Sequence, residues 1–264
     1  MRLIRFSKGE EAGYGQLEGE SIREVAAPEG DWSEDAFRKT GRAFNLNEVK
    51  LLAPCRPGKV VCVGLNYRKH AAEVGASLPE KPIIFLKPST SVSGTGDPIM
   101  IPSQSRRVDY EAELAVVLGR RTHRVCADRA LDYVFGYTCA NDVTARDLQP
   151  QNGQWTYAKS FDTFCPLGPA INTGIANPEA LPVKGVLNGK AVQDGNTADH
   201  LFSVAELIEY ISHCMTLLPG DVIMTGTPAG IGPLNPGDTF SVVIGGIGSL
   251  TNPVNKENDR TVHG

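Results

Sequence analysis

Two glutamates stand one residue apart in the segment Asp109-Tyr110-Glu111-Ala112-Glu113-Leu114. Side chains alternate across a β-strand, so this spacing predicts that both carboxylates point to one face, roughly 7 Å apart along the strand, from a rise of ~3.3 Å per residue. Two negative charges this close on a partly buried strand repel each other unless a proton or a cation lies between them. The plainer interpretation of the motif alone is a solvated strand face.

Asp142 could supply a third carboxylate, because it closes the apolar run 134–141 and begins a loop, where functional carboxylates are often found. Three carboxylates form a plausible incomplete shell for a hard cation, with water or substrate as the remaining ligands. Oxygen ligands suit Mg²⁺ or Mn²⁺, with Ca²⁺ as an alternative. The zinc motif His-Glu-x-x-His is absent from the sequence. We therefore expect Mg²⁺ or Mn²⁺ on Glu111, Glu113 and Asp142.

His70 and Glu73 could form an acid–base pair. On a helix, residues three apart share a face, and a carboxylate beside an imidazole orients the ring and stabilises its charged form, as a general base requires. Each residue alone is more simply an exposed side chain on a polar helix.

Several segments, taken in order, resemble the fumarylacetoacetate hydrolase superfamily over about residues 52–254. These segments are Gly64-Leu65-Asn66-Tyr67 ahead of His70, Asp109 to Leu114, Tyr137 to Gln149, Trp155 to Asp162, and Leu218 to Pro228. The combination is specific, whereas each piece alone is not, and the first fifty or so residues are covered less firmly.

The resemblance implies an α+β, mostly β fold: a mixed β-sheet roll around a metal pocket, with a small N-terminal domain, usually in a homodimer. It implies Glu111, Glu113 and Asp142 as the metal ligands. His70 and Glu73 would be the catalytic acid–base pair on a lid that orders when substrate binds.

The resemblance also places Lys159 beside the bound substrate as a catalytic residue, with Arg146, Gln149 and Thr227 contacting the polar groups of the substrate. The plainer interpretations are a solvated lysine, an Arg146–Asp147 ion pair, a loop amide and a turn hydroxyl.

The activity that we expect first is Mg²⁺-dependent hydrolysis of a C–C bond in an acylpyruvate-type 2,4-dioxo acid, through a metal-stabilised enolate. The same chemistry would serve an oxaloacetate-type decarboxylase, or an isomerase or decarboxylase for 2-hydroxymuconate-type acids of aromatic catabolism. The long eukaryotic family members carry a further metal-binding Asp ahead of their His, whereas this chain has Asn66 and no Asp between Gly64 and His70. This departure makes fumarylacetoacetate itself a doubtful substrate.

The chain that positions these residues divides into a small N-terminal domain, 1–52, and a catalytic domain, 53–264. In the first we expect a strand at Leu3 to Phe6 and a turn at Gly13 to Gly19. In the second, short apolar runs predict strands, and Asn188-Gly189 predicts a hairpin turn. Further strands are expected at the positions 60–63, 83–86, 99–101, 110–118, 134–140, 222–224 and 239–244.

Helices are expected to be few. Ser203 and Glu206 form a capping box ahead of apolar residues at helical spacing, and a second helix is suggested at Tyr67 to Val74.

Composition excludes several other classes. The net charge of -4 argues against nucleic acid as the main partner. No apolar run could span a bilayer, no leader pattern begins the chain, and the six cysteines form no C-x-x-C pair. We expect a cytoplasmic enzyme with free thiols. A non-catalytic metal-binding module stays open, whereas a dinucleotide oxidoreductase lacks the G-x-G-x-x-G turn.

Overall fold

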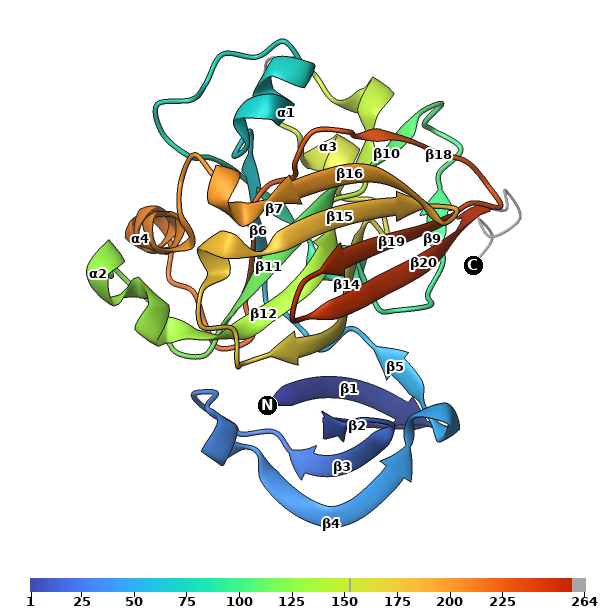
Figure 1. Cartoon of the computed structure of the whole chain (residues 1–264), viewed down its shortest axis with the longest axis vertical. Coiled ribbons are helices and arrows are strands. Elements are labelled where there is room, and N and C mark those ends of the chain that lie inside the picture. The colour runs from blue at the N-terminus through green and yellow to red at the C-terminus, as the bar shows by residue number, and fades with distance from the viewer. Residues whose placement is uncertain (152, 258–264) are drawn as a thin grey trace.

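The computed structural model describes residues 1–151 and 153–257 of the chain, so the last seven residues of the expected catalytic domain lie outside the described part. Most of the molecule is β-structure, arranged in mixed sheets with a few short helices (Figure 1). The fold prediction is confirmed.

A 12-stranded sheet runs through the molecule in the order β4-β3-β2-β1-β14-β12-β11-β17-β6-β7, with β5 paired to β1 and β8 paired to β14. Its strands are β1 (Arg2–Lys8), β2 (Glu11–Glu18), β3 (Ser21–Ala26), β4 (Arg38–Asn45), β5 (Lys50–Leu52), β6 (Val60–Gly64), β7 (Ile83–Lys87), β8 (Val92–Ser93), β11 (Ala112–Leu118), β12 (Val134–Asn141), β14 (Cys165–Asn172) and β17 (Val222–Met224).

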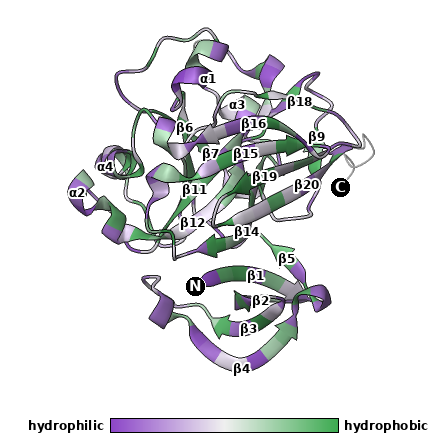
Figure 2. Ribbon diagram, viewed as in Figure 1, coloured by the Kyte–Doolittle hydropathy of each residue, from purple (hydrophilic) through white to green (hydrophobic). Residues whose placement is uncertain are grey.

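Two smaller sheets complete the roll. A five-stranded sheet in the order β16-β15-β19-β20-β9 covers one side (Figure 1), and a three-stranded sheet has the order β13-β10-β18. Their strands are β9 (Ile99–Ile101), β10 (Val108–Tyr110), β13 (Thr144–Ala145), β15 (Pro182–Leu187), β16 (Lys190–Asn196), β18 (Gly232–Leu234), β19 (Thr239–Ile244) and β20 (Gly248–Lys256). The main hydrophobic core lies between the 12-stranded and five-stranded sheets, where apolar side chains line facing strands (Figure 2).

The α-helices in the described residues are short: α1 (Arg68–Glu73), α2 (Ala127–Ala130), α3 (Thr156–Lys159) and α4 (Val204–Cys214). α4 begins after Ser203 with the predicted capping box to Glu206. The predicted hairpin turn is also confirmed, because Asn188 and Gly189 both have positive φ between β15 and β16.

Two local predictions were wrong. Residues 13–18 of the expected turn at Gly13 to Gly19 belong to strand β2, where Gly15 serves packing, since a Cβ there would lie 2.4 Å from Ile22 Cγ2; only Gly19 lies in a turn, between β2 and β3. The expected single strand Tyr110 to Leu118 is two strands in different sheets, β10 and β11, and the break falls at Glu111.

The N-terminal strands are joined to the rest by backbone pairing. β1 pairs antiparallel with β14, with Arg2 opposite Asn172 and Leu3 opposite Ile171. The small N-terminal unit therefore extends the large sheet.

All six cysteines are free. No helix in the described residues is long and apolar enough to cross a membrane.

Candidate metal centre and active site

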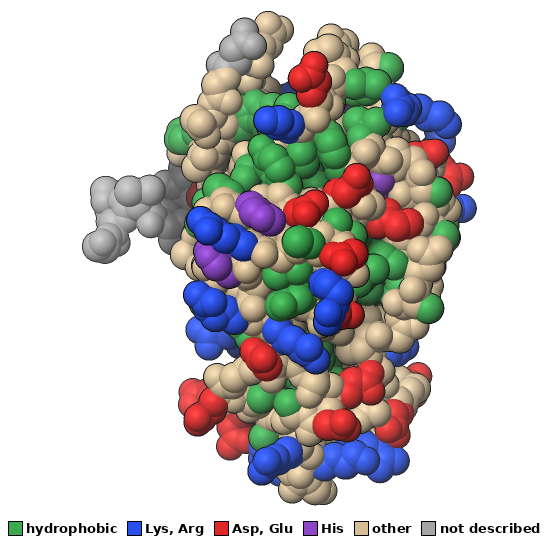
Figure 3. Space-filling model, turned by 90° about the vertical axis from the view of Figure 1, so that its left-hand side faces the viewer, with side chains coloured by type: hydrophobic (Ala, Val, Ile, Leu, Met, Phe, Trp, Pro, Cys, Tyr) green, Lys and Arg blue, Asp and Glu red, His purple; other side chains and the backbone are tan. Residues whose placement is uncertain are grey.

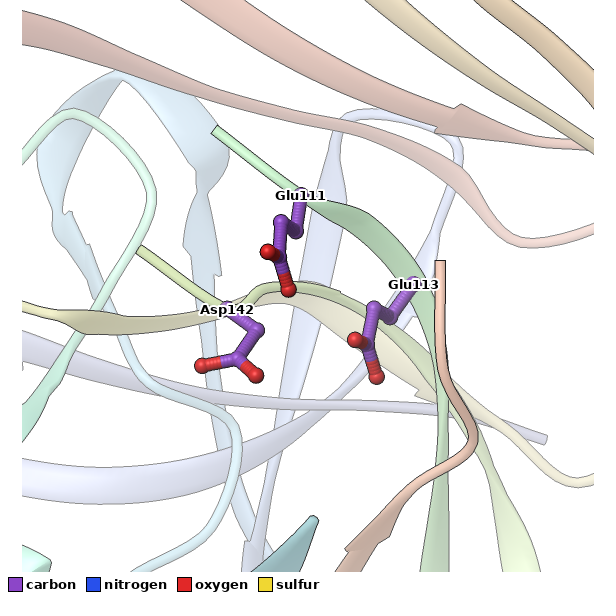
Figure 4. Close-up of side chains that lie close together, drawn as sticks. All are labelled: Glu111, Glu113 and Asp142. Atoms are coloured by element: carbon purple, nitrogen blue, oxygen red, sulfur yellow. The ribbon is translucent and has the colours of Figure 1, made fainter. Parts of the chain in front are cut away.

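The carboxylates of Glu111, Glu113 and Asp142 converge in one buried place (Figure 4). Each offers one oxygen, and these atoms all lie within 4.8 Å of one another. Glu113 lies in β11, and Asp142 directly follows β12, its neighbour in the sheet. The Asp142 N–H donates to the Glu111 carbonyl at 2.9 Å, which ties the two strand ends together.

The charges in this group are unevenly balanced. The ammonium of Lys159 donates to Glu111 Oε2 at 2.9 Å and to Asp142 Oδ2 at 2.7 Å. Burial favours a raised pKa for Glu111, but the positive charges of Lys159 and Arg146 outweigh it and hold that pKa well below its ordinary value. Burial alone would lower the pKa of Lys159, but the negative charges of Asp142 and Glu111 outweigh it and raise that pKa above its ordinary value.

Of the three carboxylates, Glu113 is the one that forms no ion pair with any residue that the structure describes. Its Oε2 accepts from the Gly226 N–H at 2.8 Å. Burial, and then repulsion from Asp142 and Glu111, raise the pKa of Glu113 well above its ordinary value. A divalent cation between the three groups would remove this repulsion.

Asp142 Oδ1 is buried and forms an ion pair with Lys87, whose Nζ lies 2.8 Å away. The ammonium of Lys87 also donates to the carbonyls of Val143, Lys159 and Phe164, so its charge is shared among several oxygens. Three buried carboxylates, of which Glu113 forms no ion pair within the described residues, fit a hard divalent cation.

Lys87 was missed by the sequence analysis. Its side chain is buried, with 1% exposed. Its ammonium donates hydrogen bonds to the carbonyl of Lys159 and to the carbonyl of Val143, the residue after Asp142. A possible signal was its place as the lone charge at the end of the apolar run Ile83-Ile84-Phe85-Leu86.

His70 and Glu73 lie on α1, as predicted, and their side chains pair: His70 Nδ1 is 3.0 Å from Glu73 Oε2. The other oxygen of Glu73 accepts from the Gly230 N–H at 2.9 Å. His70 is only 6% exposed, so it is not an ordinary surface histidine. Within the described residues, no hydrogen bond engages its Nε2.

One cavity of about 650 Å³ brings most of the predicted residues together. Its wall includes the three carboxylates, His70, Lys159, Arg146, Gln149 and Thr227, together with Val74 to Ser77 after α1. Trp155 also lines it and lies against Gly64, where a Cβ would come within 2.5 Å of the indole ring.

The predicted substrate contacts are paired within the protein. Arg146 donates to Asp109, Gln149 and Glu111, and not to Asp147. The Thr227 hydroxyl donates to the Ala112 carbonyl and accepts from Gln193. Lys159 is 3% exposed and is therefore not a solvated lysine. All four residues have places in the cavity wall, and their contacts with substrate stay predictions.

Asn66 does not face the metal group as a ligand. Its side chain donates to the carbonyls of Phe202 and Thr225 and accepts from the Phe202 N–H. Among the residues that the structure describes, the metal-binding group has three members and no fourth carboxylate.

Comparison with known proteins gives two family matches. Residues 59–255 match the model of the fumarylacetoacetate (FAA) hydrolase C-terminal region, and residues 1–54 match the Rv2993c-like N-terminal model.

Among curated relatives, protein Rv2993c of Mycobacterium tuberculosis is 46% identical over 263 residues, covering 96% of this chain and 98% of the relative. Oxaloacetate tautomerase YisK of Bacillus subtilis is 41% identical over 252 residues, covering 90% and 84%.

Solved structures are also similar. A 5-carboxymethyl-2-hydroxymuconate delta-isomerase from Mycobacterium smegmatis has a TM-score of 0.89 at 43% identity, covering 97% of this chain and 100% of that one. A maleylpyruvate hydrolase from Sphingobium sp. SYK-6, in complex with manganese(II) and pyruvate, has a TM-score of 0.80 at 30% identity, covering 98% and 100%.

Proposed function

Because the chain belongs to the fumarylacetoacetate hydrolase family of metal-dependent enzymes, we propose that it moves a proton on a small 2-oxo acid, as a keto–enol tautomerase or isomerase. One observation carries the proposal: His70, whose ring is paired with Glu73, lines the same cavity as the three carboxylates. A proton-exchanging group and a cation site in one cavity are the two parts that enolisation needs.

The donor set supports Mg²⁺ or Mn²⁺ as the cofactor, held by Glu111, Glu113 and Asp142. When bound, such a cation would act as a Lewis acid and an orienting template for the oxygens of a 2-oxo acid.

The residues of the chain would divide the remaining work. His70 Nε2 would take the proton from the carbon beside the 2-oxo group and return it to the oxygen, so that the net change is an isomerisation. Glu73 would orient the ring through Nδ1 and stabilise its charged form. The ammonium of Lys159 would lie close to the negative charge that develops on the substrate oxygen. Arg146, Gln149 and Thr227 would shape the end of the cavity that receives the substrate's other polar groups.

Hydrolysis of a C–C bond in an acylpyruvate is the second candidate, and the likeness to the Sphingobium maleylpyruvate hydrolase favours it. His70 would then take a proton from water, and the hydroxide would attack the distal carbonyl. The C–C bond would break, pyruvate would leave as its enolate close to Lys159, and the proton held by His70 would return to the enolate carbon. We place isomerisation first because the relatives named as tautomerase or isomerase are 41% and 43% identical, against 30% for that hydrolase.

A substrate panel tests the proposal. Oxaloacetate, acylpyruvates, fumarylpyruvate and hydroxymuconate-type acids are each mixed with the protein and Mg²⁺, Mn²⁺ or EDTA. Enol absorbance and product analysis then separate tautomerisation, hydrolysis and decarboxylation. We expect accelerated keto–enol conversion that EDTA abolishes. Absence of any turnover with either metal would leave only a metal-binding module.

We also propose that the protein forms a homodimer. Apolar side chains gather on the face that carries α2 and α4 (Figure 3), where Ile84, Phe202 and Tyr210 line a surface groove. Light scattering at several concentrations should give twice the monomer mass, and a monomer mass throughout would refute the proposal.

A further inference from the structure

A second cavity of about 530 Å³ lies where the N-terminal strands meet the rest of the chain. Its wall comes from Arg5 on β1, the stretch from Leu52 to Pro57 after β5, and the stretch from Ser89 to Asp97 around β8. It shares no lining residue with the cavity of the metal centre. It is therefore a separate site.

Two arginines, Arg5 and Arg56, give this cavity its charge. Neither guanidinium forms an ion pair or donates a hydrogen bond within the described residues; Arg5 is partly buried, whereas Arg56 is exposed. Some other arginines are paired: Arg42, for example, is held by Glu24. A partly buried cation without a partner is costly, so an anion in the cavity would be favoured.

The acidic group that lines the cavity is already engaged. Asp97 pairs with Lys50 at 2.7 Å and accepts from the Gly94 N–H at 2.8 Å. Its charge is therefore balanced without the arginines, and the cavity keeps net positive character.

A hydroxyl group also lacks a partner in this place. Ser93 lines the cavity with 9% exposed, and its Oγ is buried without a hydrogen bond from any described residue. Its backbone is held, because β8 pairs with β14 and a Cβ on Gly94 would lie 2.6 Å from the Ala53 nitrogen. Buried polar groups normally have a partner, so a ligand oxygen is expected there.

We propose that this cavity binds a small oxyanion, a phosphate or carboxylate group of a metabolite. The guanidinium groups of Arg5 and Arg56 would hold it, since planar donors match both anions in pairs. The Ser93 hydroxyl would donate the further hydrogen bond. The volume of the cavity leaves room for a ligand larger than the anionic group itself.

Calorimetry on the full chain tests the site, with EDTA present so that no metal contributes. The probes are inorganic phosphate and succinate, which represent the two sources of the anionic group. We expect saturable binding of one ion per chain for at least one probe, and the tighter probe identifies the group. Arg5→Gln and Arg56→Gln should each weaken it about tenfold or more, since bonds between charged partners are the strong ones. Ser93→Ala should weaken it less.

The matched control is Arg38→Gln, because Arg38 is an exposed arginine of the same N-terminal unit and does not line the cavity. Its affinity should equal that of the wild type. If neither probe shows saturable binding, the proposal is overturned. It is also overturned if Arg56→Gln and Ser93→Ala both bind with wild-type affinity, because the anion would then lie elsewhere. Arg56→Gln changes an exposed side chain and Ser93→Ala removes a single oxygen, so both variants should fold and keep the test valid even if Arg5→Gln does not fold.

Discussion

The ammonium nitrogen of Lys87 lies 2.8 Å from Asp142 Oδ1 while it donates to the backbone carbonyls of Val143, Lys159 and Phe164. One buried cation thus joins a proposed metal ligand to the backbone of a proposed catalytic lysine. The position of both groups depends on it.

Replacing Lys87 with methionine should therefore destabilise the fold strongly. Three carbonyls and a carboxylate would lose a buried partner, and breaking a buried ion pair costs about 3–5 kcal/mol. Urea unfolding measures the change. Lys81→Met is the control, because Lys81 is exposed and should stay within about 0.5 kcal/mol of the wild type. A loss under about 1 kcal/mol for Lys87→Met would mean that its contacts contribute little.

Metal binding should depend on Glu113. Glu113→Gln replaces one of three carboxylate ligands by a neutral amide and removes the charge that most needs a cation, so calorimetry should show loss of Mg²⁺ or Mn²⁺ binding. Glu10→Gln, at an exposed turn, should bind metal as the wild type does. If Glu113→Gln binds metal with unchanged affinity, the assignment of ligands is wrong.

Catalysis and metal binding should separate at His70. His70→Ala should keep near wild-type metal affinity, because no ligand is lost, but should slow proton transfer by roughly 10²–10⁴, the usual contribution of a general base. Decarboxylation of oxaloacetate needs no such base and should suffer much less.

Glu73→Gln should show a milder form of the same pattern, because Glu73 orients His70 and does not take the proton. Both rates are measured on one preparation at saturating Mg²⁺. A joint collapse of the two rates and of metal affinity in His70→Ala would give His70 a structural role.

The segment 66–78 should be protected by ligand. It contains α1, whose start is anchored by the buried Tyr67 and Ala71, but residues 72–78 are mostly exposed and line the cavity through Val74 to Ser77, and a stretch that buries little apolar area opens easily. We expect weak amide-exchange protection in the free protein and more with Mg²⁺ and oxalate, a mimic of the pyruvate enolate. Equal protection in both states would argue against a lid.

Stability at low pH should depend in part on Glu24. The hydrogen bond that Glu24 accepts from Arg42 lowers its pKa below the ordinary 4.5. Burial acts in the opposite direction, and a hydrogen bond from Thr40 lowers the pKa further. A lowered pKa in the folded state means a contribution that is present above about pH 4.5 and is lost as the pH falls through the folded-state value.

Glu24→Gln should therefore cost about 1 kcal/mol at neutral pH, because Arg42 is half exposed and its charge is screened. The difference in unfolding free energy between the two proteins should shrink toward pH 3. Glu29→Gln, at an exposed position, should show no such trend. A difference that stays constant across this range would mean that the ionised pair does not stabilise the fold.

Local features could be predicted from the sequence because they depend on neighbours in the chain. The capping box of Ser203 and Glu206, the Asn188-Gly189 turn and α1 all follow from short-range hydrogen bonding and backbone preference, and the structure confirms them. Strand periodicity also predicted that Glu111 and Glu113 lie close together, although in the structure β11 begins only after Glu111. That Asp142 joins these two glutamates was a hypothesis drawn from the residue types and from their order in the sequence, and the structure brings the three carboxylates together.

Other features were decided only when distant segments packed. The chain leaves one sheet for another at Glu111, which strand periodicity does not reveal. The backbone carbonyls that Lys87 binds lie 56 to 77 residues away in the chain, so its role exists only after β7 lies beside the metal centre. Arg146 pairs with Asp109 and Glu111 in place of its neighbour Asp147 for the same reason. Burial removes water from these charges, and only the tertiary structure determines which opposite charge replaces it.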